Sequence, residues 1–248
     1  TYPITEGNVA NDKNAVEAKQ EHWTKWMWNA IATYNLEIGK HRGDAMVGME
    51  LNREDDINFS GYKEDYSILT PDYMWPNAGS GTAQAYGSGE GYSLVSFFGK
   101  LNYTYDDKYL LSMTVRRDGS SRFHKDNRWG NFYSVGASWN MKQESFLQDV
   151  DWLDALKLRA SYGEVGNNMG VSLYGHMALY TIDKNGGEAA LVKQSLSAPD
   201  IKWETTQTVD IAVEGRLFNR LNFQIGYFDK RSKDLLFEVR LPLSAGSY

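Results

Sequence analysis

Apolar and polar residues alternate along segments of about ten residues, and this pattern restricts the fold more than any other feature of the sequence. In one such segment, Leu111, Met113 and Val115 fall on one face, whereas Ser112 and Thr114 fall on the other. Successive side chains of a β-strand point to opposite faces of its sheet, so each segment predicts a strand with one apolar and one polar face. We predict about eight strands, at 26–38, 44–52, 95–105, 109–116, 133–141, 156–162, 208–214 and 221–227.

Charged residues on the polar face limit what this face can contact. They are Glu50, Lys100, Arg116, Lys157, Arg159, Asp210 and Glu214. Burying so many charges in a sealed core would be unfavourable. The polar face is therefore expected to meet solvent or the wet lumen of a barrel.

The lengths of the links between strands alternate in order along the chain. Links 39–43, 106–108 and 218–220 are short, and 142–154 is of medium length on the same side. The long links are 59–91, 118–131, 166–202 and the segment from 232 onward, and residues 1–24 are expected to form an outer loop. Outer-membrane barrels have short periplasmic turns and long outer loops, which this order matches. Within the medium link, 146–153 breaks the alternation and predicts one helical or irregular turn.

Composition excludes several other classes of protein. No apolar run reaches the 18 residues that a membrane-spanning helix needs, and mean hydropathy is −0.54. There are no cysteines, which excludes disulfides and thiolate metal sites. The net charge of −6 offers no basic field to attract nucleic acid, so no nucleic-acid partner is expected. The scattered residues His22, His41, His124 and His176 form no metal or hydrolase motif, and we expect no metal, no cofactor and no catalytic residue.

Aromatic residues gather beside the short links. Tyr103, Tyr105 and Tyr109 flank one short turn, and Trp139 and Phe146 flank another. In a barrel these side chains would form part of an aromatic girdle at the membrane interface. Ordinary packing between neighbouring strands is the alternative reading.

Several long segments resemble one family of transporters. The sequence SLVSFFGKLNYTYDDKYLLSMTVRRDGSSRF (93–123) is similar to the barrel signature of SusC/RagA-like, TonB-dependent (TonB-linked) outer-membrane transporters. The similarity continues through NRWGNFYSVGASW (127–139), FLQDVDWLDALKLRASYGEVGN (146–167) and KWETTQTVDIAVEGRLFNRLNFQIGYFDKRSKDLL (202–236). His124 and Tyr133 depart from the usual family residues, at the two ends of one loop.

This resemblance implies an all-β fold, namely a transmembrane antiparallel segment of a larger, plugged barrel of 22 strands. Residues 1–248 would all belong to the barrel domain, without the plug domain, the TonB box or the terminal strand. The family imports oligosaccharides or peptides across the outer membrane of Gram-negative bacteria. The implied partners are a SusD-like surface lipoprotein that acts as a lid, the TonB complex, outer-membrane lipid and the substrate.

The long link 59–91 contains the candidate contact residues. They are Tyr62, Tyr66, Tyr73, Trp75 and Tyr86. Exposed aromatic rings stack on sugars and anchor protein interfaces, so these residues are candidates for contact with the lid or the substrate. Alternatively, they pack the link onto itself or onto the barrel rim.

Two kinds of charged cluster are explained more simply by ion pairs and solvated turns than by ligand-binding sites. The arginines 116, 117, 122 and 128 surround the turn Asp118–Gly119, where pairing with neighbouring carboxylates explains them better than an anion site. Two acidic groups, 54–56 and 149–154, lack the glycine and distal glutamate of a calcium loop, and we interpret them as solvated turns.

Two other architectures are compatible with the alternation alone. One is a soluble carbohydrate-binding β-domain or a fragment of a glycosidase, for which the aromatic residues and carboxylates are the support. The other is a complete eight-stranded barrel. The segment LPLSAGSY (241–248) argues against closure, since it contains a proline and no alternation.

Overall fold

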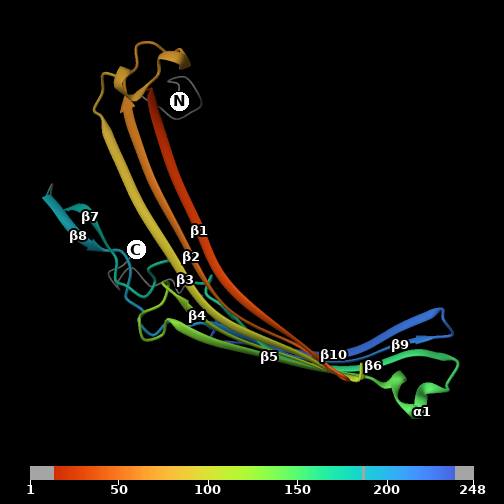
Figure 1. Cartoon of the computed structure of the whole chain (residues 1–248). Helices are drawn as coiled ribbons and strands as arrows, with labels where there is room; N and C mark the ends of the chain where they lie inside the picture. The colour runs from red at the N-terminus through yellow and green to blue at the C-terminus, as the bar shows by residue number, and fades with distance from the viewer. Residues whose placement is uncertain (1–13, 186–187, 238–248) are drawn as a thin grey trace. The chain divides into compact units, whose positions relative to one another are not determined.

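The computed structural model describes residues 14–185 and 188–237, and antiparallel strands dominate it (Figure 1). The eight strands of the main sheet are β1 (Ala15–Ile38), β2 (His41–Glu64), β3 (Gln84–Tyr105), β4 (Tyr109–Ser120), β5 (Trp129–Asn140), β6 (Leu153–Asn167), β9 (Glu204–Leu217) and β10 (Leu221–Lys233). They follow one another in the order β1-β2-β3-β4-β5-β6-β9-β10. All eight predicted strands are confirmed. Within the described residues β1 and β10 end the sheet and do not pair, so it is not a closed eight-stranded barrel.

The first three strands are much longer than the alternation predicts. β1 and β2 have 24 residues each and β3 has 22, whereas a spanning strand needs 9–11. The prediction of an outer loop at 1–24 is therefore wrong from Ala15 onward, and residues 1–13 lie outside the described part. In 17–22 polar residues occupy both faces of the strand, so the sequence does not alternate there. The backbone nevertheless forms a strand, which the sequence pattern could not predict.

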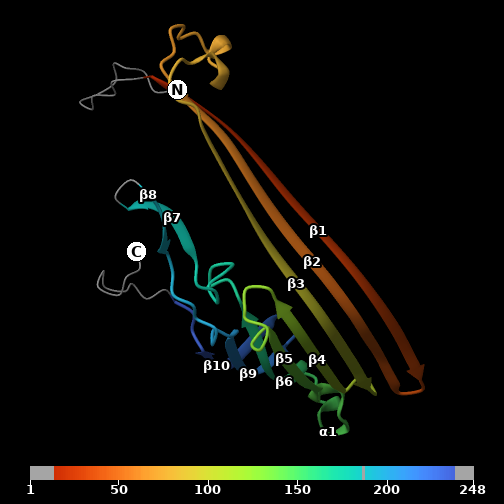
Figure 2. The same cartoon turned by 90° about the vertical axis from the view of Figure 1, so that its left-hand side faces the viewer.

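The link between β6 and β9 contains a separate hairpin that the sequence analysis missed. β7 (Tyr180–Asn185) pairs with β8 (Glu188–Lys193) as a two-stranded sheet. Figure 2 shows this hairpin apart from β4, β5 and β6. Six-residue strands with exposed Ile182 and Leu191 give too short an alternation to distinguish from a loop.

The chain divides into two compact units. Among the described residues, the first unit contains 14–26 and 53–92, and the second contains 27–52, 93–185 and 188–237. The strands β1, β2 and β3 run through both units. No helix in the described part of the chain is long and apolar enough to cross a membrane.

Register in the second unit aligns side chains of one kind across neighbouring strands. One row contains Leu101, Met113, Val135, Tyr162 and Val209 in direct pairing. We call this side of the sheet the apolar face. The opposite side, which carries Asn102, Ser112, Ser161 and Asp210, is the polar face.

The apolar face has no protein layer over it among the described residues. Ile225 is 72% exposed, Tyr227 67% and Met113 43%. Such an extended exposed apolar surface is unfavourable in water and favourable against hydrocarbon.

The turns at 39–40, 106–108, 141–152 and 218–220 form one end of the sheet, the short-turn end. Backbone hydrogen bonds join each turn to the next, from Asp106 N to Lys40 O (2.8 Å) and from Asn140 N to Lys108 O (2.7 Å). Phe218 N donates to Trp152 O at 2.9 Å. Phe218 has a φ of 52°, which a bulky residue seldom adopts and which this contact holds in place.

The medium link contains the predicted helical turn. It consists of the 3₁₀ turn η3 (Met141–Gln143) and the short helix α1 (Ser145–Gln148), at the short-turn end in Figure 1. Lys142 Nζ donates to the carbonyl oxygens of Leu147 (3.0 Å), Gln148 (3.2 Å) and Val150 (2.8 Å). A cation on the last carbonyls of a helix satisfies groups that lack a backbone partner, so Lys142 fixes the shape of this link.

Glu144 joins this link to the aromatic residues of the apolar face. Its carboxylate accepts hydrogen bonds from Tyr109 Oη (2.7 Å), Trp139 Nε1 (3.1 Å) and Lys108 Nζ (3.2 Å). The ring of Tyr109 stacks between those of Tyr105 and Trp139, at centroid distances of 6.4 and 6.3 Å. These aromatic residues thus lie in a row beside the short turns. They pack against one another across neighbouring strands, and their position also suits an aromatic girdle at a membrane interface.

We expect Glu144 to make the short-turn end sensitive to acid. The hydrogen bond from Tyr109, followed by those from Trp139 and Lys108, lowers the pKa of Glu144 below its usual 4.5. A carboxyl group with a lowered pKa stabilises the folded state fully above pH 4.5, and this contribution is lost as the pH falls through the lowered pKa. The Glu144→Gln variant of the full-length protein in detergent should therefore unfold at a lower temperature than the parent at pH 7, and this difference should shrink toward pH 3.

The matched control is Asp149→Asn, which removes an exposed carboxylate from the same link. If Glu144→Gln and Asp149→Asn have equal effects at every pH, the three hydrogen bonds do not stabilise this end.

Opposite the short turns, a buried cluster joins the long links. Phe123 is fully buried, and Phe132 and Trp203 are 6% and 8% exposed. The Trp203 ring lies 5.3 Å from that of Phe123 and 5.4 Å from that of Phe132, and its Nε1 donates to Arg128 O at 2.9 Å. Aromatic packing with a satisfied indole fixes the links 121–128 and 198–203 against β5.

Candidate functional site

The polar face carries paired charges across its strands. Arg159 Nε lies 2.7 Å from Glu214 Oε1, and its Nη1 lies 2.5 Å from Asp210 Oδ1. These pairs join β6 to β9, and the side chains remain about one third exposed. The two carboxylates balance the charge of the guanidinium. These charges are tolerated on a hydrated surface, whereas burying them in a sealed core would be unfavourable.

A second set of polar contacts joins β2, β3 and β4. Asn102 Nδ2 donates to both carboxylate oxygens of Asp44, at 3.2 and 2.9 Å, and Asn102 Oδ1 accepts from Ser112 Oγ at 2.9 Å. Farther from the short turns, Arg116 Nε donates to Asp118 and its Nη2 donates to the Ser96 hydroxyl at 2.9 Å. The polar face therefore carries several groups of hydrogen-bonded side chains, each of which joins neighbouring strands.

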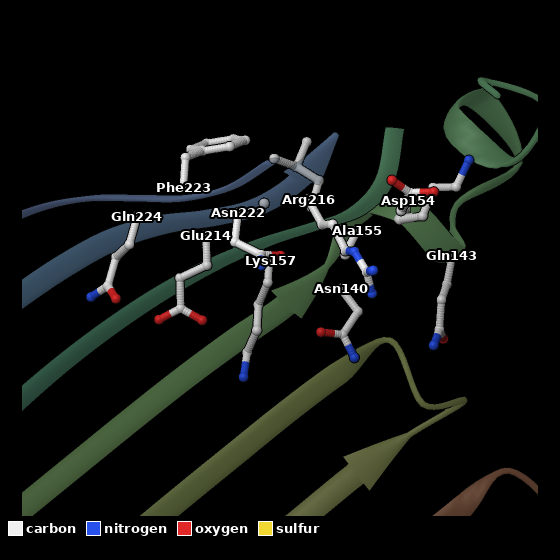
Figure 3. Close-up of a pocket in the computed structure, with 13 residues that line it drawn as sticks. Asn140, Gln143, Asp154, Ala155, Lys157, Glu214, Arg216, Asn222, Phe223 and Gln224 are labelled. Atoms are coloured by element: carbon white, nitrogen blue, oxygen red, sulfur yellow. The ribbon is translucent and has the colours of Figure 1, made fainter. Parts of the chain in front are cut away.

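Near the short-turn end the sheet has a hollow lined by residues of β6, β9 and β10 (Figure 3). In this view Asn140, Lys157, Glu214 and Gln224 point to the same side of the sheet, whereas Phe223 points to the other. Lys157 pairs directly with Glu214 in the register of β6 and β9. The hollow thus presents amide, ammonium and carboxylate groups together on the polar face.

This arrangement can bind and orient polar molecules and water along the sheet. Amide and hydroxyl groups offer both donors and acceptors, and the charges lie mostly in pairs. Among the described residues no group of three or more histidine, aspartate or glutamate side chains is arranged to hold a metal ion. The geometry fits the wall of an aqueous passage.

The structure separates the five candidate aromatic residues of 59–91. Tyr62 lies on β2 and Tyr86 on β3, so only the middle of the segment is a loop. Tyr73 and Trp75 are 64% and 65% exposed there, and Tyr86 is 56% exposed. Tyr66 is only 6% exposed, which removes it from the available surface.

Tyr66 has a structural position in the first unit. Asn14 Nδ2 donates to Tyr66 O at 2.9 Å, and Tyr66 N donates to Asn14 Oδ1 at 2.6 Å. Its ring packs against Gly79, and burial raises the pKa of its hydroxyl. Nothing in the sequence distinguishes this tyrosine from the exposed ones, because the partner Asn14 is 52 residues away.

The charged clusters pair with groups of the protein. Arg116 binds Asp118, as predicted, but Arg122 Nη1 donates to Val171 O (2.6 Å) and Arg117 lies 5.1 Å from the centre of the Trp129 ring. His176 is buried, with Nδ1 3.1 Å from Arg122 O. The acidic residues 54–56 lie within β2 and not in a turn, so the interpretation as a turn was wrong for them. In the acidic group 149–154, Asp154 Oδ2 accepts from Asn219 N at 2.5 Å, which fixes the turn between β9 and β10.

The sheet, its sorted turns and its two unlike faces define a segment of a membrane-spanning β-barrel wall. The model of the family "TonB dependent receptor-like, beta-barrel" matches residues 2–247. The chain belongs to this family.

Proteins of similar sequence support the assignment of the chain to this family. The chain is 36% identical over 197 residues to TonB-dependent receptor P26 of Formosa agariphila. The matched segment covers 76% of the chain and 18% of that protein. It is 33% identical over 224 residues to TonB-dependent receptor SusC of Bacteroides thetaiotaomicron, covering 87% of the chain and 22% of SusC. The chain spans about a fifth of the length of these relatives.

Solved structures show the same fold. The RagAB peptide transporter superposes with a TM-score of 0.86 at 24% identity, covering 98% of this chain and 27% of that one. The "open-open" state of the RagAB peptide importer gives a TM-score of 0.77 at 25% identity, covering 95% of this chain and 26% of that one. The predicted fold class and the predicted SusC/RagA-like family are both confirmed.

Proposed function

We propose that the protein containing this chain imports oligosaccharides or peptides across the outer membrane, with energy supplied through TonB. This chain contributes part of the barrel wall, and the plug domain, the TonB box and the terminal strand lie in other parts of the protein. The observation that carries the proposal is an exposed apolar face on one side of the sheet and hydrogen-bonded polar and charged side chains on the other. The family match and the relatives named SusC and RagAB support it.

The polar face lines the passage, and its function is passage without chemical change to the substrate. Paired charges such as Arg159 with Asp210 remain hydrated, while amides and hydroxyls exchange hydrogen bonds with a moving polar substrate. The apolar face meets lipid. A soluble carbohydrate-binding domain would not need such a face, so recovery of the protein from the soluble fraction without detergent would contradict the proposal.

We further propose that a SusD-like surface lipoprotein is the partner of this transporter and closes over it as a lid. The exposed rings of Tyr73, Trp75 and Tyr86 are the proposed contacts for this lid or for substrate, and Tyr62 of β2 is a further candidate. Exposed aromatic residues frequently dominate protein interfaces, which favours this segment over the other loops.

The test is uptake of labelled oligosaccharides and labelled peptides by cells that express the full-length protein. Uptake of one class is expected, and it should stop when TonB is deleted. In the same cells the double variant Tyr73→Ala, Trp75→Ala should reduce co-purification of the lipoprotein, whereas Met169→Ala, an equally exposed side chain of another loop, should not. Uptake that persists without TonB would overturn the transport proposal, and unchanged co-purification would overturn the lid contact alone.

A further inference from the structure

The apolar face contains a pit near the short-turn end. Ala137 of β5 and Ala160 of β6 pair directly and form its exposed floor. Larger side chains surround them: Tyr103, Leu111, Trp139 and Leu158. The pit has a volume of about 390 Å³ and is lined almost entirely by carbon.

The polar atoms at the rim are turned away from the pit and have partners. The Tyr103 hydroxyl lies 2.7 Å from His41 Nδ1, and Trp139 Nε1 donates to Glu144 at 3.1 Å. These hydrogen bonds occupy the polar atoms of the two rings, so their carbon atoms are what they offer to the pit. A polar ligand would find no free hydrogen-bonding partner at these two rings, so the chemistry of the pit selects a hydrocarbon.

The position of the pit also indicates its occupant. Ala137 is two residues from Trp139 along β5, which places the floor about 7 Å deeper than the aromatic row. The next row of the apolar face, from Leu101 to Val209, crosses the neighbouring strands in direct pairing. The pit is therefore part of the surface that meets lipid hydrocarbon just beyond the headgroups.

We propose that this pit holds one acyl chain of a phospholipid of the leaflet that surrounds the short-turn end. This inference rests on the proposed function, because it requires the apolar face to lie in a membrane. Lipid tails are as apolar as leucine, so selection comes from packing in a matching hollow and not from the hydrophobic effect. The flat remainder of the face offers a passing chain fewer contacts than the pit between β3 and β6.

The test is photo-crosslinking in bilayers that contain the full-length protein and a phospholipid with a diazirine on one acyl chain. After illumination, mass spectrometry locates the lipid adducts. We expect several-fold more adducts at Ala137, Leu158 and Ala160 than at Val213 and Ile225, which lie on the same face in the row of Trp139.

Filling the pit supplies the matched comparison. The double variant Ala137→Leu, Ala160→Leu should reduce adducts in the pit to the level at Val213, while Ala32→Leu, the same change on β1 away from the pit, should leave them unchanged. Heat-dependent mobility on gels verifies that each variant is folded.

Three results would overturn the inference. Adducts spread equally over the apolar face would show that the pit selects no chain. Adducts elsewhere on the apolar face but not in the pit would show that the pit is closed to lipid chains. Adducts nowhere on the apolar face would contradict the membrane location itself, and the proposed function with it.

Discussion

Replacing Phe123 by alanine is expected to release the long links from the sheet, with a loss of about 3–5 kcal/mol of local stability. Phe123 is fully buried against Trp203, with Val171, Ile201 and Leu236 packed around the cluster. Truncation leaves a cavity that the surrounding rings cannot close, because Trp203 is held by its hydrogen bond to Arg128 O.

Hydrogen exchange on the full-length protein measures this effect. Amides of 121–128 and 198–203 should exchange much faster in Phe123→Ala than in the parent, whereas β4 and β5 near the short turns should keep their protection. The control is Phe146→Ala, which removes the same side chain from a position that is 63% exposed. Equal exchange in Phe123→Ala and the parent would mean that the cluster does not hold the links.

Replacing Gly166 by alanine is expected to destabilise the same region by overpacking, by about 3 kcal/mol. A Cβ atom at Gly166 would overlap the ring of Phe132. That ring is packed against Trp203 at 5.4 Å, so it cannot swing away without disturbing the cluster. Glycine is required here for close approach, even though its backbone conformation is available to other residues.

Gly163→Ala is the matched control on the same strand. Its Cβ would lie 3.4 Å from the Ser134 Cβ, which is ordinary contact, so little change is expected. The thermal midpoint of the full-length protein in detergent and the exchange of 198–203 report the two effects. If both alanine variants behave like the parent, the packing around Phe132 is looser than the structure indicates.

Alternation predicted the strands wherever the two faces have unlike surroundings. In β4 and β5 the apolar residues 111–115 and 133–137 repeat with period two because one face lacks any polar partner. The same rule failed for 15–25 and for 59–64, where both faces carry polar residues and period two gives no contrast. The short links were predicted at the right places, and the structure has a turn of two residues at 39–40 and turns of three residues at 106–108 and 218–220.

The exposure of the candidate aromatic residues was harder to predict because burial depends on distant partners. Tyr66 and Trp75 look alike in the sequence, yet Tyr66 packs under Gly79 and binds Asn14, whereas Trp75 is 65% exposed. The pit at Ala137 and Ala160 has the same origin. It depends on the register of β5 against β6, which brings together two alanines that are 23 positions apart.

The hydrogen bonds between successive turns have a mechanical consequence. A load applied to any one of these turns passes sideways through Lys40–Asp106, Lys108–Asn140 and Trp152–Phe218 to its neighbours. Neighbouring strands then share the load, and separating them requires many backbone hydrogen bonds to break at once. One hairpin is therefore not expected to separate from the sheet on its own. The turns at this end of the sheet are therefore expected to resist deformation together.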